Sequence, residues 1–234
     1  MANHTQYSLD LLEFGEHHVK NALHCLLHTI FFNRALGMVQ PREVDADGRL
    51  DVYWVECNDP QVEETVRRRV DEFAGWLAHA FQAAPNQPQR AVVTVQFYES
   101  KRVKHLFSET VEKNLWEEWN IHLKISPTGR PAGGDDVEER RQVERLSQEL
   151  RDRMRIILEK VDEKKDHLPQ VRQVGGGTAS GVATSSAGEV LGMTYNYCIV
   201  LPMSDGSDKT AGGEFMKGLG GMFGATGNPL NLLG

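Results

Sequence analysis

The 234-residue sequence predicts an α+β fold. Three long segments place apolar residues at helical spacing, and five shorter segments have the composition or alternation of strands. Their order along the chain is strand, helix, strand, helix, two strands, helix, a glycine-rich loop and a last strand. Because the last strand follows a long flexible loop, it can pair far from its neighbours in the sequence. The hydrophobic fraction, 40% of the residues, suffices for one sizeable core.

The first helix is expected over residues 16–36, after a segment at 8–14 that is either a short strand or the lead into the helix. Gly37 is a natural stop for this helix. One face of the helix is apolar, at Val19, Ala22, Leu23, Leu26, Leu27, Ile30 and Phe31.

A strong helix-start signal follows the second strand, which is expected over residues 49–57 because they alternate at strand period. Asp59 can accept hydrogen bonds from the free amides of a first helical turn, and Pro60 fits the first helical position. Pro85 ends this second helix. Residues 91–99 then form a strand rich in β-branched and aromatic side chains.

The fourth strand is expected at 118–125, where Trp119 and the apolar residues after it alternate with polar ones. We expect it to form an antiparallel pair with 91–99 through a long connecting loop, residues 100–115. Trp119 then faces the core, whereas Trp116 packs at the base of the loop.

The last part of the chain holds a third helix over residues 137–164, whose apolar face lies opposite a charged, solvated one. A flexible loop rich in glycine, serine and threonine follows at 174–192, and a last strand at 194–201. Residues 203–234 are a glycine-rich tail that we expect to be loosely ordered.

Composition and charge argue against several classes of function. The formal net charge of −7 does not indicate a nucleic-acid partner. No run of 18 apolar residues is present, and the first residues lack the pattern of a secretory signal. The three scattered cysteines form no CxxC pair, which is typical of reduced thiols in a cytoplasmic protein.

The histidines of the first helix are the main candidates for a metal site. His17, His24 and His28 fall on the stripe opposite its apolar face, and residues four apart on a helix can share one metal ion. However, the glutamate of an HExxH motif is absent, and no acidic third ligand is spaced nearby. A polar stripe that faces solvent or a second layer is the better interpretation.

No catalytic signature occurs elsewhere. The sequence has no nucleophile elbow, no phosphate-binding loop and no dinucleotide fingerprint. We therefore expect no catalytic residue, no bound metal and no cofactor.

Three stretches together resemble the autophagy-related protein 101 family, especially its plant-type members: LHTIFFNRALGMVQP (27–41), NLWEEWNIHLKI (114–125) and EKKDHLPQV (163–171). Their order and approximate spacing also agree with that family. The resemblance covers roughly residues 9–170 and the strand at 194–201.

This resemblance implies a HORMA domain over residues 1–202, a mainly antiparallel sheet backed by three long helices. It also implies a non-catalytic scaffold or adaptor subunit of the autophagy-initiating kinase complex, in the cytoplasm and recruited to the phagophore assembly site. Such a subunit pairs with the HORMA domain of autophagy-related protein 13, stabilises it, and recruits downstream factors through an exposed loop.

That loop, the Trp-Phe finger of the family, corresponds here to His105, Leu106 and Phe107. Phe107 fits the position of the phenylalanine, whereas Leu106 replaces the tryptophan. Tryptophan is the stronger anchor, because it buries more area and its N–H seeks a partner. The sequence therefore predicts a docking tip that binds its partner more weakly than the family finger does, or that prefers a different partner.

Three alternatives remain open from the sequence. A metal-dependent enzyme would use the helix histidines, and a HORMA adaptor of another pathway would differ in its C-terminal segment. In the tail, an apolar helical face between Phe215 and Phe223 can fold on a partner or make at most weak contact with a membrane.

Overall fold

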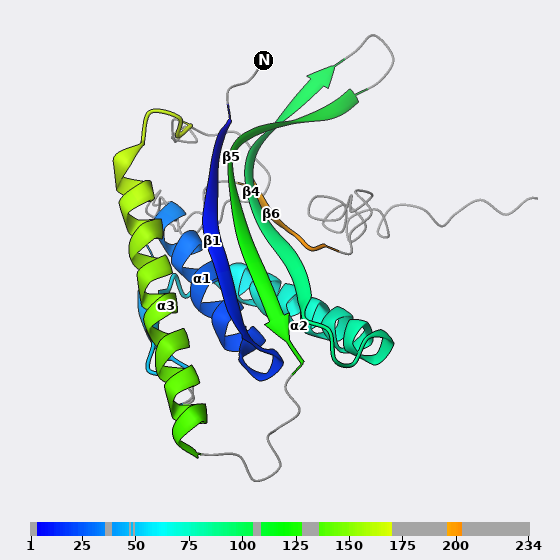
Figure 1. The fold of residues 1–234 in the computed structure, drawn as a ribbon. Coiled ribbons are helices and arrows are strands. Elements are labelled where there is room, and N and C mark those ends of the chain that lie inside the picture. Colours follow the sequence, from blue (N-terminus) through cyan, green and yellow to red (C-terminus); the bar gives the residue numbers. More distant parts are fainter. Residues whose placement is uncertain are drawn as a thin grey trace, which may run out of the picture. The chain divides into compact units, whose positions relative to one another are not determined.

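The main sheet has four strands in the order β1-β5-β4-β6, and the helices pack on one side of it (Figure 1). The computed structural model describes residues 4–35, 39–46, 48, 50–104, 109–127, 136–169 and 196–202. Its strands are β1 (Thr5–Gly15), β4 (Gln89–Lys104), β5 (Glu109–Ser126) and β6 (Asn196–Val200). β1 runs parallel to β5, whereas β4 pairs antiparallel with both β5 and β6. The α+β prediction and the mainly antiparallel sheet are confirmed.

Three helices supply the second layer. A single 3₁₀ turn, η1 (Glu16–His18), leads into α1 (Val19–Arg34), and the others are α2 (Pro60–Ala83) and α3 (Asp136–Glu163). α1 is the central helix, since it contacts α2, α3 and the small second sheet described below. Most of its side chains are buried, and this explains why its apolar positions extend beyond one narrow stripe.

The start of α2 follows the predicted chemistry. A side-chain oxygen of Asp59 accepts from the backbone N–H of Gln61 at 2.9 Å and of Val62 at 3.3 Å, and Pro60 occupies the first helical position. The side chain thus satisfies two of the N–H groups that a helix start leaves without a partner.

The predicted alternation along β5 is also confirmed. Its inward side chains, Trp119, Ile121, Leu123 and Ile125, are at most 1% exposed. The intervening side chains, Glu118, Asn120, His122 and Lys124, are partly exposed on the opposite face. Trp116 is buried as well, at the place where β5 leaves the body of the sheet.

Two predictions of secondary structure were wrong. The strand expected at 49–57 is only β3 (Tyr53–Glu56), and it pairs with a strand that the sequence did not indicate, β2 (Arg42–Asp45). The long loop expected at 100–115 is instead a continuation of β4 and β5, which pair up to Lys104 and Glu109.

Several expectations fall outside the described residues. They concern Gly37, the loop at 174–192 and the tail at 203–234. The strand expected at 194–201 is present as β6, so the chain returns to the sheet after the loop. No helix in the described part of the chain combines the length and apolar character needed to cross a membrane.

Candidate functional site

The most distinctive surface feature is a two-stranded arm that extends from one end of the sheet (Figure 1). We define the arm as residues 99–104 of β4 and 109–114 of β5. β1 accompanies β5 only as far as Glu117, and β6 accompanies β4 only as far as Tyr98. Within the described residues, therefore, no third strand pairs with the arm.

The arm is a long two-stranded ribbon. Its register runs through six residue pairs, from Glu99 opposite Asn114 to Lys104 opposite Glu109. At roughly 3.4 Å per residue this is about 20 Å. The side chains of residues 110–114 are all exposed, and Val111 is 59% exposed.

The predicted site residues belong to the segment that joins the two strands of the arm. His105, Leu106 and Phe107 lie in residues 105–108, outside the described residues. In the chain they connect Lys104 at the end of β4 to Glu109 at the start of β5, and we refer to residues 105–108 as the tip.

A β-bulge in β5 forms the root of the arm. Phe97 is opposite Glu117 and Tyr98 is opposite Leu115, so Trp116 is the extra residue. A bulge bends the strand and increases its twist. Here it also allows two consecutive residues, Trp116 and Glu117, to be buried at 4% and 0% exposure.

The carboxylate of Glu117 accepts four hydrogen bonds at this root. Arg34, at the end of α1, donates from Nε to Oε1 and from Nη2 to Oε2, both at 2.7 Å. Trp119 Nε1 donates to Oε1 at 2.5 Å, and His167 Nε2 lies 2.5 Å from Oε2. Burial of a carboxylate is costly unless it is paired, and here every lone-pair direction has a donor.

A second buried carboxylate, Glu56, holds the small sheet against α1. It accepts from Arg42 Nη2 at 2.5 Å and from Trp54 Nε1 at 3.2 Å, and His28 Nε2 lies 3.3 Å from its Oε1. His28 is therefore buried, at 2% exposure, and does not face solvent. It belongs to the polar contact between α1 and β3. Of the two environments expected for the polar stripe, solvent or a second layer, His28 has the second.

The environment of His28 favours its neutral form. Its pKa is lowered to about 4, chiefly by burial; Glu56 opposes this lowering, whereas the neighbouring His24 and Arg42 add to it. Burial also acts to raise the pKa of Glu56, but the hydrogen bond from Arg42, with His28 and Trp54, gives a net lowering.

The histidines of η1 and α1 do not converge on one point. The rings of His24 and His28 stack with centroids 5.7 Å apart, whereas His17 lies against His18 at 3.9 Å. In the described residues, no group of three or more His, Cys, Asp or Glu side chains is placed to hold a metal ion.

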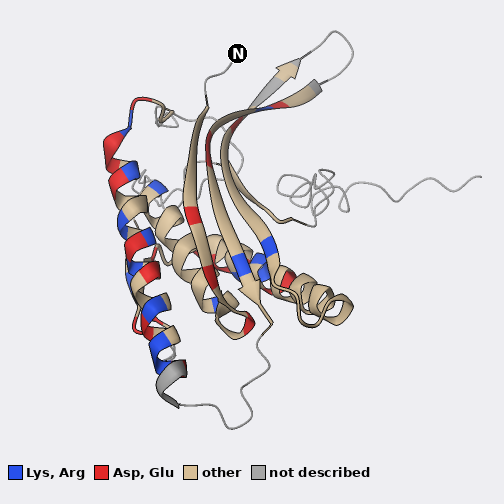
Figure 2. Ribbon diagram, viewed as in Figure 1, with Lys and Arg blue, Asp and Glu red and all other residues tan. Residues whose placement is uncertain are grey.

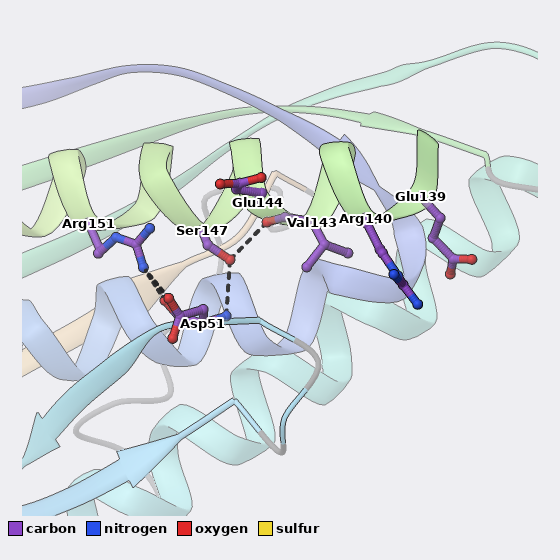
Figure 3. A pocket seen from close by; sticks show the side chains of 7 residues that line it. All are labelled: Asp51, Glu139, Arg140, Val143, Glu144, Ser147 and Arg151. Carbon is purple, nitrogen blue, oxygen red and sulfur yellow. Dashed lines mark hydrogen bonds and ion pairs between the residues drawn. The ribbon is translucent and has the colours of Figure 1, made fainter. Parts of the chain in front are cut away.

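The exposed face of α3 is a second candidate surface. Figure 2 shows residues of both charges along its length. Near the N-terminal half of α3 there is a hollow of about 660 Å³ (Figure 3), lined by Asp51, Glu139, Arg140, Val143, Glu144, Ser147 and Arg151. Arg151 Nη1 pairs with Asp51 Oδ2 at 3.0 Å at one end of it, and Ser147 Oγ accepts from the Asp51 backbone N–H at 3.1 Å.

Sequence reasoning missed the cluster at the root of the arm. Trp116 and Trp119 were assigned correctly, but Glu117 between them was not recognised as buried, and His167 was assigned no contact. The available signal was an acidic residue next to two tryptophans in a strand whose alternation makes residue 117 an inward position.

Comparisons with known proteins give a consistent result. The sequence model of a family described as autophagy-related protein 101 matches residues 12–174. The chain is also 30% identical over 173 residues to autophagy-related protein 101 of Arabidopsis thaliana, a match that covers 68% of this chain and 77% of that protein.

Proposed function

Because the chain belongs to the autophagy-related protein 101 family, a HORMA-fold family with a role in autophagy, we propose that it is a non-catalytic adaptor of the autophagy-initiating kinase complex. In this role it binds the HORMA domain of autophagy-related protein 13 through one surface and downstream autophagy factors through another. It acts in the cytoplasm, at the phagophore assembly site.

The observation that carries the proposal is the arm. A paired ribbon about 20 Å long extends from the body of the sheet, and residues 105–108 connect its two strands in the chain, which supports a role for this segment in binding a partner. Isolated two-stranded ribbons are marginally stable in water, so the buried residues at the root supply the support that the arm lacks along its length.

For the HORMA partner we propose the exposed face of α3. α1 is an unsuitable surface, because most of its side chains are already buried. α3, in contrast, presents a long mixed-charge face in which Leu158 is 50% exposed. An apolar residue with polar residues around it matches the pattern of an apolar interface core inside a polar rim.

The buried groups of the described residues also fit a non-catalytic role. Burial raises the pKa of the Cys25 thiol to about 12 and that of Cys57 to about 11, so neither supplies a thiolate near neutral pH. His28 and Glu56 face each other inside the fold, where both side chains are buried.

Co-purification tests the heterodimer. Tagged chain, co-expressed with the HORMA domain of autophagy-related protein 13, should retain it at moderate salt in a one-to-one complex. Failure to form any complex with that domain would contradict the proposal.

The role of the tip is tested separately by Leu106→Ala/Phe107→Ala. This double variant should keep the fold and the heterodimer but lower the recruitment of later autophagy factors in cells. The control is Val111→Ala, which changes an exposed residue of the arm outside the tip. It shows whether any disturbance of the arm, and not only loss of the tip side chains, lowers recruitment. Normal recruitment by the double variant would remove the tip from the proposal.

A further inference from the structure

The segment that follows α3 passes beneath the root of the arm. This strap, residues 164–169, leaves the end of the helix at Glu163 and turns through a hydrogen bond from Leu168 N–H to Lys165 O at 3.1 Å. Its first three residues are exposed, whereas His167 and Leu168 point inward and Leu168 packs against the core. The strap is not paired with any described strand.

His167 makes the closest contact between the strap and the root. Its Nε2 lies 2.5 Å from Glu117 Oε2, and its ring lies 5.9 Å from that of Trp116 and 6.4 Å from that of Tyr7. An ionised carboxylate already paired with Arg34 can only accept, so His167 is the donor in this contact. Both Trp116 and Glu117 are bulge residues, so the strap contacts the point at which the arm bends.

The other donors to Glu117 remain if the strap leaves. Arg34 and Trp119 supply three of its four hydrogen bonds, and both belong to the body of the fold. A released strap would therefore leave a carboxylate that is still paired, and the large penalty of an unpaired buried charge would not arise. The strap can therefore dock and detach while the rest of the protein stays folded.

We propose that His167 is a positioning residue that latches the strap onto the bulge and thereby restrains the arm. With the latch closed, the ring of Trp116 is held between Phe97 and His167, and the direction of the arm is set. When His167 detaches from Glu117, the bulge loses its packing on one side. The two strands of the arm then separate locally more often. Because linkage is reciprocal, any partner that holds the arm in its closed direction also tightens the strap.

The inference can be tested on the full chain without a partner, so its failure is distinguishable from failure of the proposed function. Amide hydrogen exchange is compared for wild type, His167→Leu and His167→Gln. Leucine fills similar space but cannot donate, whereas the glutamine amide can reach and donate from a position like that of Nε2. The reporting amides are residues 100–104 and 110–114, and the reference amides are residues 120–124.

His167→Leu should raise the exchange rate of the arm amides about tenfold and leave the reference amides unchanged, since loss of one hydrogen bond to a charged group has this order of effect on local opening. His167→Gln should restore rates close to wild type. Equal arm rates in all three proteins would overturn the inference, as would a parallel rise in arm and reference amides.

If His167→Leu does not fold, His167→Asn replaces it in the comparison. Its shorter side chain stays polar but cannot reach Glu117, so it should show the same local increase. An increase with asparagine that glutamine fails to reverse would indicate that ring packing, and not the donated hydrogen bond, restrains the arm, and would also overturn the inference.

Discussion

At the scale of single residues, two buried carboxylates connect the layers of the fold. Glu56 joins α1 to the small sheet, and Glu117 joins α1, β5 and the chain after α3. Each is surrounded by donors from different elements, so each fixes the mutual position of those elements more than it adds net stability.

The ion pair of Arg34 and Glu117 offers a direct comparison with a surface pair of the same geometry. Arg34 is 2% exposed and Arg67 is 61% exposed, and each donates from Nε and Nη2 to one glutamate. We predict that Arg34→Met costs roughly 3–5 kcal/mol of unfolding free energy, because it leaves a buried carboxylate without its cation. Arg67→Met should cost under about 1 kcal/mol. Urea titration of both variants measures the difference; equal losses would contradict it.

We expect His28 to contribute to the pH dependence of the free energy of unfolding. Its folded-state pKa of about 4 lies below the unfolded value of 6.5, so the unfolded state binds the proton more readily. Stability should therefore fall as the pH is lowered from about 6.5 to 4, by at most roughly 3 kcal/mol from this residue. His28→Gln should flatten that part of the profile.

The matched control for this profile is His79→Gln, at an exposed position on α2. It should leave the acid slope of the wild type in place. An acid slope that survives intact in His28→Gln would show that another group causes it.

Residue-scale prediction succeeded where a side chain had only one reasonable environment. Trp119 alternates with aliphatic residues, and burial follows directly. His28 was harder, because a histidine stripe opposite the apolar face suits solvent, a second layer or a metal equally well. The contact that decides among them comes from β3, more than 20 residues away, and nothing local to α1 encodes it.

At the scale of elements, the arm is the largest departure from the sequence-based expectation. Residues 100–104 and 109–114 are rich in charged residues, which are depleted in strands, so they suggested a loop. The antiparallel register of β4 and β5 simply continues past the bulge and overrides these weak local preferences. The short strand β2 was missed for a related reason, since its four residues, REVD, lack a run of strand formers.

The N-terminal cap of α2 gives a prediction at this scale. Asp59→Ala should lower the unfolding free energy by about 1 kcal/mol, because two first-turn N–H groups lose their acceptor. Asp59→Asn keeps an acceptor oxygen and should cost much less. Chemical denaturation of the two variants checks this, and equal losses would mean that the cap does not stabilise the helix through these bonds.

The surface proposed on α3 makes a prediction about binding. Leu158→Glu should weaken the complex with the HORMA domain of autophagy-related protein 13 at least about tenfold, by placing a charge at an apolar contact. Stability should change by about 0.5 kcal/mol or less, since the side chain is half exposed. Val92→Glu, at 37% exposure on the open face of the sheet, is the matched control and should bind normally. Surface plasmon resonance distinguishes the two, and normal binding by Leu158→Glu would exclude this face.

At the scale of the whole molecule, the strand order could not have been read from the sequence. β1 pairs in parallel with β5, about a hundred residues later, and β6 returns beside β4 after residues 170–195. Such pairings depend on which faces the helices cover, and local patterns do not specify them. The sequence did predict that the last strand is free to pair with a distant element, and the structure places it beside β4.

In the proposed function, the molecule is a scaffold with two separate binding surfaces. α3 lies on the helical side of the molecule, whereas the arm continues the far end of the sheet (Figure 1). The two surfaces share no described residue, so a change at one should leave binding at the other intact.

The most direct test of this claim is a calorimetric titration of the HORMA domain of autophagy-related protein 13 into wild-type chain and into Leu106→Ala/Phe107→Ala. We predict one-to-one binding with a Kd that agrees within about twofold between the two proteins, because we propose that the HORMA domain binds α3 and not the tip. The absence of binding to wild type, or its loss in the tip variant, would contradict the account.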